Sequence, residues 1–340
     1  MQYLKLVAGS DISKDKFTSR FGKLDIKTNQ TITEEKEFPN NMKGFKQFLA
    51  WIKKLVSGLK QTELPELQFV MDATGVYYEN LAYFLAENGM FVSVVLPNKI
   101  KYFIKTTNYK SKTDGIDALA ITQYGLEKTL PKWRFPGVQF RRLKELTREY
   151  HTIVEDTTRL KNRLHAKNHS YDPNPGTKRR IMEQIKFFNL QKKEVLKQIN
   201  EIIEKDEELK SKINKITATK GIGLITVVST VMETDGFALV ENQKQLTSYA
   251  GYDIVHNQSG QKSSKTHISK KGNKHLRRAV YMAAVSASYR NDIYKKFYIR
   301  LCKKKEYKRV GIVAIARKIL LLIYTLWKND AAYDPNYKRA

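Results

Sequence analysis

The sequence predicts an α/β fold for the first 135 residues and mainly α-helical structure for the rest of the chain. Strand-like apolar runs alternate with helical patterns in the first part, whereas two long polar helical patterns and then shorter apolar ones make up the second. A chain of 340 residues is long enough for two or three domains with cores of their own. We therefore expect domains at residues 1–135, 136–213 and 214–330, followed by a tail at 331–340.

The first domain should begin with a meander of three strands, because runs rich in β-branched and aromatic residues are separated by polar turns. A helix with its apolar residues on one face follows, and then buried strands and helices alternate. The order β-β-β-α-β-α-β-α is that of a ribonuclease-H-like domain. The expected strands are Tyr3–Ser10, Lys16–Leu24, Thr31–Phe38, Leu67–Met71 and Phe91–Leu96; the expected helices are Met42–Leu59, Tyr78–Glu87 and Asp114–Tyr124, with a loop after Pro97.

Four aspartates stand where this order of elements can gather them. Asp11 and Asp72 each end an apolar strand, and Asp114 and Asp117 lie three residues apart on one face of a helix. Mg²⁺ prefers oxygen ligands, and metal ions held by carboxylates can polarise a phosphate and activate the attacking oxygen. The pattern therefore predicts a site for Mg²⁺, or for Mn²⁺, that serves phosphodiester chemistry.

The balance of charge points to a polyanionic partner. The sequence has 62 Lys and Arg residues against 34 Asp and Glu residues, a formal net charge of +28. A single cysteine excludes an internal disulfide, and the first residues lack the apolar core of a signal peptide. The most apolar stretch, Gly311–Trp327, is short for a membrane span and contains Arg317 and Lys318. We expect a buried helix there, no membrane partner, and a cytoplasmic, nucleoid-associated protein.

Residues 136–213 carry two long amphipathic helical patterns, at 138–170 and at Lys178–Ile213. The segment Asp172–Gly176, with two prolines and a glycine, breaks the helix between them. Both apolar stripes are narrow, which predicts an antiparallel coiled coil. Such a stripe can be buried within the chain or against another copy. This domain is therefore the candidate for joining subunits in a homodimer or homotetramer.

The last domain carries a glycine turn and a basic segment. Lys220, Gly221 and Gly223 precede an apolar helix, where backbone N–H groups can face a phosphate, although a tight turn between helices explains the glycines equally well. The basic segment offers either further phosphate contacts or a solvated helix face. Its residues are Lys270, Lys271, Asn273, Lys274, Arg277 and Arg278.

Taken together, these motifs resemble those of the DEDD-type insertion-sequence transposases of the "one-ten" family, relatives of the Piv DNA invertases. The likeness covers nearly the whole chain. It rests on GSDISKDKF, MDATGVYYENLAYFL, VVLPNKIKYF and KTDGIDALA in the first half, and on KGIGLITVVSTV, LTSYAGYD, QSG and HISKKGNKHLRRAVYMAA in the second. The resemblance implies a RuvC-like fold for the first domain and the family's second transposase domain, with a helix-hairpin-helix-like glycine turn, at the end of the chain.

The resemblance also implies roles for individual residues. The family's four metal-binding acids match Asp11, Asp72, Asp114 and Asp117, with Asp72 in place of the usual glutamate. The family's serine nucleophile matches Ser259, which taken alone would be an ordinary Ser-Gly turn. With the two domains acting together, this serine would attack a DNA phosphodiester with help from the metal, leaving a covalent phosphoserine link and a free 3′-OH.

These implications make the chain a DNA transposase or site-specific recombinase acting on the ends of an insertion element and on a target. The resemblance further implies a structured noncoding guide RNA that selects both DNA sites, although no residue pattern identifies an RNA site. Two alternatives stay open. A metal-dependent Holliday-junction-type resolvase or nuclease would use water instead of Ser259, and a decayed relative would bind nucleic acid without cleaving it.

Overall fold

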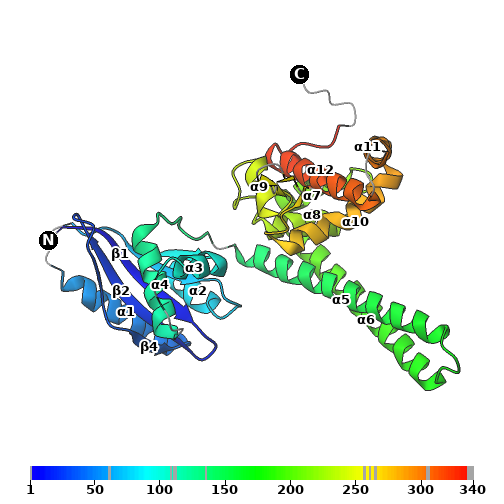
Figure 1. Cartoon of the computed structure of the whole chain (residues 1–340). Coiled ribbons are helices and arrows are strands. Elements are labelled where there is room, and N and C mark those ends of the chain that lie inside the picture. The colour runs from blue at the N-terminus through cyan, green and yellow to red at the C-terminus, as the bar shows by residue number, and fades with distance from the viewer. Residues whose placement is uncertain are drawn as a thin grey trace. The chain divides into compact units, whose positions relative to one another are not determined.

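The computed structural model describes residues 2–59, 63–107, 109, 113–134, 136–255, 258–259, 262–263, 266–303 and 307–334. The chain divides into two compact units, Met1–Phe135 and Pro136–Ala340 (Figure 1). The first unit combines a sheet with helices, and the described part of the second is helical apart from four very short strands. The predicted succession of an α/β part and a mainly helical part is confirmed.

The first unit is built around one sheet with the strand order β3-β2-β1-β5-β6, in which β4 also pairs with β2. The pairs formed by β2 are antiparallel, whereas β1, β5 and β6 run parallel to one another. The central strand β1 thus joins an antiparallel half to a parallel half. The strands are β1 (Tyr3–Ile12), β2 (Lys16–Asp25), β3 (Gln30–Ile32), β4 (Lys36–Pro39), β5 (Leu67–Asp72) and β6 (Phe91–Val95).

The helices of this unit are α1 (Met42–Ser57), α2 (Glu79–Glu87), α3 (Pro97–Ile104) and α4 (Asp114–Glu127). They cover both faces of the sheet. Successive residues of a strand point to opposite faces, so Leu6 packs in one apolar cluster and Val7 in another. The first cluster contains buried residues of α1 and α2, and the second contains residues of α3 and α4.

Two glycines allow α4 to lie directly on the sheet. A Cβ atom on Gly22 of β2 would lie 2.6 Å from Cγ2 of Thr122, and one on Gly9 of β1 would collide with the same threonine. Thr122 is fully buried in the middle of α4. The position of this helix is therefore fixed by close contact with β1 and β2.

Two expectations for the first unit are corrected. The strand expected at Thr31–Phe38 is interrupted and forms β3 and β4, because the residues between them turn toward Arg20, whose guanidinium binds the carbonyl of Thr33. The loop expected after Pro97 is the helix α3. Proline suits the first turn of a helix, where its missing N–H is not needed, and Ile100 buries one face of α3 in the second cluster.

The second unit begins with a long antiparallel helical hairpin of α5 (Val138–Asn168) and α6 (Pro175–Glu204), which lie side by side in Figure 1. Asn174 caps α6, since its side chain accepts a hydrogen bond from the backbone N–H of Thr177 at 3.1 Å. The narrow apolar stripes meet inside the chain, where Ile153 and Ile199 are buried in the same cluster.

The second helical pattern does not run unbroken to Ile213, as expected, but divides into α6 and α7 (Glu207–Thr217). Asp206 causes the break. Its carboxylate accepts a hydrogen bond from the backbone N–H of Leu209 at 3.0 Å and so caps a new helix. Leu209 and Ile213 then turn into the core of the compact helices that follow rather than along the hairpin.

The compact helices are α8 (Leu224–Glu233), α9 (Gln243–Tyr249), α10 (Lys274–Arg290), α11 (Asp292–Cys302) and α12 (Lys308–Lys328). Within the described residues, α12 is the one helix long and apolar enough to cross a membrane. Its apolar residues, however, are packed in the core of the unit: Ile315, Ile319 and Ile323 are fully buried. A buried helix was expected here, and the structure contains one.

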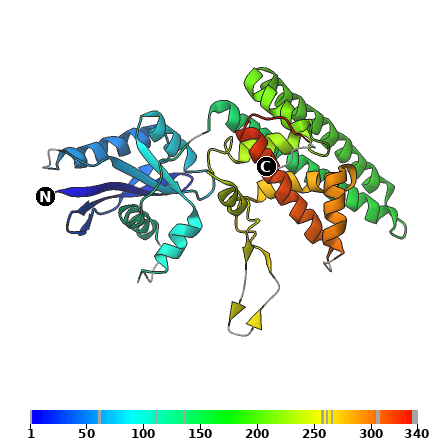
Figure 2. The same cartoon turned by 90° about the horizontal axis from the view of Figure 1, so that it is seen from above.

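Two pairs of short strands form a β-hairpin between α9 and α10. β7 (Ile254–Val255) pairs with β10 (His267–Ile268), and β8 (Gln258–Ser259) pairs with β9 (Lys262–Ser263). Figure 2 shows these strands reaching away from the helices of their unit.

Candidate active site

The four aspartates singled out in the sequence line one cavity of about 770 Å³ in the first unit. Asp11 lies near the end of β1, and Asp72 is the last residue of β5. Asp114 and Asp117 belong to the first turn of α4. Residues from three elements, separated by up to about a hundred positions in the sequence, thus reach the same hollow.

Parallel strand pairing brings the first two aspartates together. Ser10 of β1 is paired with Met71 of β5, so Asp11 and Asp72 lie at the same edge of the sheet. Helix α4 begins at this cavity, and its cap is Thr113, whose side chain accepts a hydrogen bond from the backbone in the first turn at 3.2 Å. Carboxylates in a first turn also suit the positive end of the helix dipole.

Burial and like charge make Asp11 an unusual carboxyl group. Burial, followed by the negative charges of Asp72, Asp117 and Asp114, raises the pKa of Asp11 to about 7. A carboxyl group in this state binds a proton near neutral pH when no cation is present. A divalent cation would relieve the same repulsion, so the group is suited to exchange a proton for a metal ion.

Asp72 presents an unpartnered oxygen to this site. Its Oδ2 accepts a hydrogen bond from the hydroxyl of Thr74, whereas its Oδ1 is buried and has no hydrogen-bond partner. Burial is also the main cause that raises the pKa of Asp72. A buried carboxylate oxygen without a partner is costly, and coordination to a cation would remove that cost.

The donor set therefore fits a hard cation such as Mg²⁺, since all four side chains supply carboxylate oxygens. In the described part of the chain, however, no three His, Cys, Asp or Glu side chains are gathered as closely as the ligands of one ion. The shared cavity, the repulsion at Asp11 and the unpartnered oxygen of Asp72 are the observations in favour of a metal. Glu79, the next acid along the chain, is exposed at the start of α2 and does not line the cavity.

Arg20 of β2 holds the start of α4 in place, a role that the sequence did not indicate. Its Nε donates a hydrogen bond to the carbonyl of Gly115 at 3.1 Å, and its Nη2 forms an ion pair with Glu35 at 2.7 Å. Gly115 stands between Asp114 and Asp117. Arg20 thus fixes the backbone that carries both of these aspartates.

Lys101 of α3 and Lys105, which caps the end of α3, also line the cavity. Neither was predicted, because this segment was expected to form a loop. Lys101 and Lys105 lie four residues apart, so they share one face of the helix. The spacing of lysines in KIKYFIK was the available signal. Both residues therefore add positive charge to a cavity lined by carboxylates.

Ser259, the predicted nucleophile, lies in the hairpin of the second unit. Its backbone belongs to β8 and is paired with Lys262 of β9. Its side chain is outside the described residues. The two ends of the hairpin are joined by a side-chain hydrogen bond, which the hydroxyl of Ser269 donates to a carboxylate oxygen of Asp253 at 2.6 Å.

In the basic segment after this hairpin, the arginines are bound to other groups of the protein, whereas the lysines are exposed. Arg277 donates hydrogen bonds to the carbonyls of Ala250 and Gly272, at 2.9 and 3.2 Å, and so ties the base of the hairpin together. Arg278 binds the carbonyl of His151 and forms an ion pair of 2.8 Å with Glu155, both on α5. Each of these arginines has a structural role. Among the other predicted phosphate contacts, the exposed side chains are Lys220, Lys270, Lys271 and Lys274.

Asn273 belongs to a buried polar cluster that the sequence did not reveal. Its Oδ1 caps α10 by accepting hydrogen bonds from two backbone N–H groups, and its Nδ2 donates to Glu233 at 2.8 Å. Glu233, at the end of α8, is 1% exposed and receives two further hydrogen bonds from Arg148 of α5, at 2.6 and 2.9 Å. This cluster connects α5, α8 and the start of α10.

The glycine turn before α8 makes the close backbone contact that a tight turn between two helices requires. Gly221 has a φ of 93°, and a Cβ atom on it would lie 3.0 Å from the backbone of Ala287 in α10. Gly223 caps α8 and has open space where a side chain would be. Phosphate binding at this turn stays a prediction, for which Gly223 has room.

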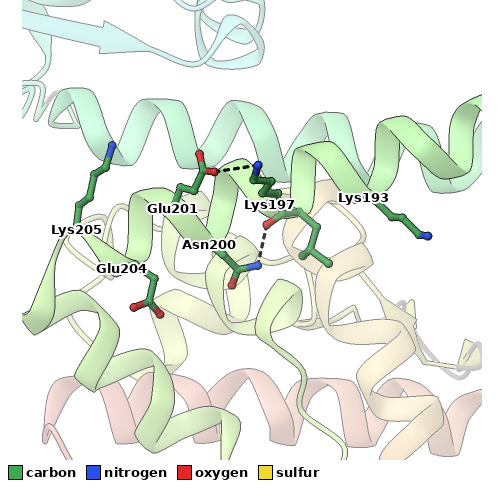
Figure 3. Close-up of a pocket in the computed structure, with 7 residues that line it drawn as sticks. Lys193, Lys197, Asn200, Glu201, Glu204 and Lys205 are labelled. Carbon is green, nitrogen blue, oxygen red and sulfur yellow. Dashed lines mark hydrogen bonds and ion pairs between the residues drawn. The ribbon is translucent and has the colours of Figure 1, made fainter.

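A shallow hollow along α6 carries no candidate chemistry. Figure 3 shows that its lining contains both cations and anions, and Lys197 is paired with Glu201 at 3.8 Å. Asn200 is occupied as well, since it donates a hydrogen bond to the carbonyl of Leu196 at 2.8 Å. Groups of mixed charge on a single exposed helix have no preference for an anionic ligand.

Comparisons with known proteins match two family models to successive parts of the chain. Residues 8–171 match a family model described as "Transposase", and residues 213–299 match one described as "Transposase IS116/IS110/IS902 family". The two matches include all four aspartates, Ser259 and the basic segment.

Two similar proteins are both described as "Pilin gene-inverting protein", one from Moraxella bovis and one from Moraxella lacunata. Each is 28% identical to this chain over 337 residues, covering 97% of the chain and 98% of the relative. Among solved structures, a Ppx/GppA family member from Aquifex aeolicus aligns over 96% of this chain and 92% of its own, with 11% identity and a TM-score of 0.22. That score establishes no common fold.

Proposed function

Because this chain belongs to the IS110 family of transposases, we propose that it cuts and rejoins DNA through a covalent link between Ser259 and a DNA phosphate. The chain is a DNA recombinase enzyme of that family. The observation that carries the finer proposal is the convergence of Asp11, Asp72, Asp114 and Asp117 on one cavity, with one oxygen of Asp72 buried and unpartnered.

The four aspartates would hold Mg²⁺ or Mn²⁺. When bound, the metal would neutralise charge on the phosphate and so lower the barrier to its attack. Arg20 positions two of the ligands through the carbonyl of Gly115, and Lys101 and Lys105 add positive charge beside the site. The order of the strands, antiparallel around β2 and parallel from β1 to β6, with the last acids on α4, supports a ribonuclease-H-like, RuvC-like assignment of the first unit.

The step at Ser259 is a transesterification. A bond forms between the serine Oγ and phosphorus, and the bond from phosphorus to the 3′ oxygen of DNA breaks. The serine hydroxyl loses its proton, and the departing 3′ oxygen gains one. The exchange conserves the number of phosphoester bonds, so rejoining needs no ATP.

Two partners complete the proposal. A structured noncoding guide RNA would choose the element ends and the target, and the net charge of +28 favours a second polyanion beside DNA. A second copy of the chain, in a dimer or tetramer, would meet the helical hairpin. Met182, Phe187 and Leu190 of α6 are more than half exposed there and offer an apolar surface. The protein would act in the cytoplasm, on the nucleoid.

The direct test uses a duplex with a nick near the crossover point, so that the cut strand diffuses away and the link cannot be reversed. In Mg²⁺, wild-type protein should remain attached to DNA in denaturant, with the adduct on Ser259 by mass spectrometry. Ser259→Ala should abolish the adduct. Ser263→Ala is the matched control, since Ser263 lies in β9 of the same hairpin, and it should retain the adduct.

Asp11→Asn should also abolish the adduct while leaving duplex binding intact. Cleavage without any adduct would instead show hydrolysis by water, as in a resolvase. Duplex binding without cleavage in any divalent metal would identify a nucleic-acid-binding protein that has lost catalysis.

A further inference from the structure

A groove between α11 and α12 has the chemistry of a binding site for unpaired nucleic acid, at a distance in sequence from every predicted site residue. It has a volume of about 720 Å³, and its walls come from α11, α12, Gln243 and Tyr333. That volume lies within the range of about 300–1,000 Å³ that is usual for pockets holding organic ligands. A nucleotide is a ligand of this size.

The floor of the groove is apolar and aromatic. Phe297 of α11, Leu321 and Leu322 of α12, and Tyr294 and Tyr333 line the groove. Ile293 at the margin is 52% exposed, a large value for an isoleucine. Flat apolar surfaces of this kind are the platforms on which bases stack in proteins that bind single strands.

The margin of the groove is cationic. Lys296 and Arg300 lie four residues apart on α11, and Lys318 faces them from α12. Among the described residues, none of those that line the groove carries a carboxylate. The hollow on α6 differs, because Glu201 and Glu204 are among its lining residues and Lys197 is paired with Glu201.

Contacts at Phe297 show how the two kinds of surface would work together. The ammonium of Lys318 lies 4.7 Å from the centre of the Phe297 ring, and the guanidinium of Arg300 lies 5.5 Å from it. A base entering the groove would replace a cation over the ring, and the displaced cation would then meet the adjoining phosphate.

We propose that this groove binds an unpaired segment of DNA, with a base stacked on Phe297 and phosphates held by Lys296, Arg300 and Lys318. Duplex DNA keeps its bases inside and would leave the aromatic floor unused, so the floor favours a single strand. DNA is the substrate of this enzyme family, and an exchange of strands between duplexes passes through unpaired segments. The proposal does not depend on Ser259 or on the metal site.

The test measures binding of a fluorescent 12-nucleotide oligo(dT) to the full-length protein by anisotropy, at several salt concentrations. Phe297→Leu keeps the apolar volume but removes the ring, and should weaken oligo(dT) binding about tenfold. Lys296→Gln and Lys318→Gln should each lower the slope of log affinity against log salt by about 0.7, the value for one lost phosphate contact on a single strand. The control is Lys193→Gln on α6, with the same change of charge, which should leave both values unchanged.

Three outcomes overturn the proposal. One is unchanged oligo(dT) affinity and salt slope in all three groove variants. A second is tighter groove-dependent binding of the RNA oligomer of the same sequence, which would assign the groove to RNA. If Phe297→Leu fails to fold by circular dichroism, the two lysine variants decide, because both side chains are exposed and their loss leaves the core intact. An equal loss of duplex affinity in those variants would also contradict the assignment to single strands.

Discussion

Breaking the ion pair between Arg148 and Glu233 should lower the free energy of unfolding by an amount that depends on which of the two residues is replaced. The Glu233 side chain is 2% exposed, whereas the Arg148 side chain is 45% exposed. Removing Arg148 leaves a buried carboxylate with Asn273 as its remaining side-chain donor. Removing the charge of Glu233 leaves an arginine that water can already reach. The two substitutions are therefore unequal.

We expect Arg148→Met to lower the free energy of unfolding by about 3–5 kcal/mol, the usual cost of an uncompensated buried charge. Glu233→Gln should cost only about 1–3 kcal/mol, because the amide still accepts a hydrogen bond and nothing charged is left buried. Urea unfolding of the full chain, followed by the circular dichroism of its helices, measures both values. The double variant Arg148→Met, Glu233→Gln should be more stable than Arg148→Met alone.

The pH dependence supplies a second check. Burial alone would raise the pKa of Glu233, but hydrogen bonds from Arg148 and Asn273 and the charge of Arg148 outweigh it and hold the pKa below its usual value. A carboxyl group with a lowered pKa adds stability above its unfolded pKa and loses it as the pH falls. The advantage of wild type over Glu233→Gln should therefore shrink in acid. Equal costs for the two single variants, or an advantage independent of pH, would refute this account of the pair.

Three further predictions concern the first unit and DNA. Asp11→Asn should stabilise the metal-free protein at pH 7 and have no effect below about pH 4. Burial and its acidic neighbours raise the pKa of Asp11 to about 7, so its charged form is unfavourable in the folded protein. Urea unfolding midpoints at both pH values measure this difference. Arg20→Met should weaken Mn²⁺ binding about tenfold by calorimetry through the loosened start of α4, whereas Lys16→Met, which removes an exposed ion pair, should not. Duplex affinity should fall by orders of magnitude between 50 and 200 mM salt, as several phosphate contacts require, and a flat response in filter binding would exclude the basic surface.

Local sequence patterns predicted most elements of the first unit, because the spacing of apolar residues along each segment indicates either a strand or a helix. The strand at Leu67–Met71 and the helix at Asp114–Tyr124 both exist, displaced at their ends by one to three residues. The loop after Pro97 was wrong because a proline marks a helix start as readily as it ends a strand. The long second helix of the hairpin was wrong because Asp206 competes for the backbone as a cap.

Local sequence patterns also predicted some residues of the candidate site and missed others. The four aspartates were singled out by residue type and position, and the structure brings them to one cavity. Arg20 and the pair of Arg148 with Glu233 were missed, because a cation that binds a distant carbonyl or carboxylate has no local signature. For the same reason the sequence did not reveal that Arg277 and Arg278 are bound within the protein, and their contact with phosphate stays a prediction.

The place of β1 in the sheet has a consequence for synthesis on the ribosome. One edge of β1 finds β2 as soon as residue 25 has emerged, but the partner of its other edge, β5, begins at Leu67. At about 5–20 residues per second, residues 13–66 take roughly 3–11 s to be made. For that time the nascent chain carries an open strand edge, the feature most prone to pairing with other chains. The acids at residues 11 to 117 are then complete well before Ser259 is translated. A nascent chain therefore has its carboxylates in place before it has the proposed nucleophile.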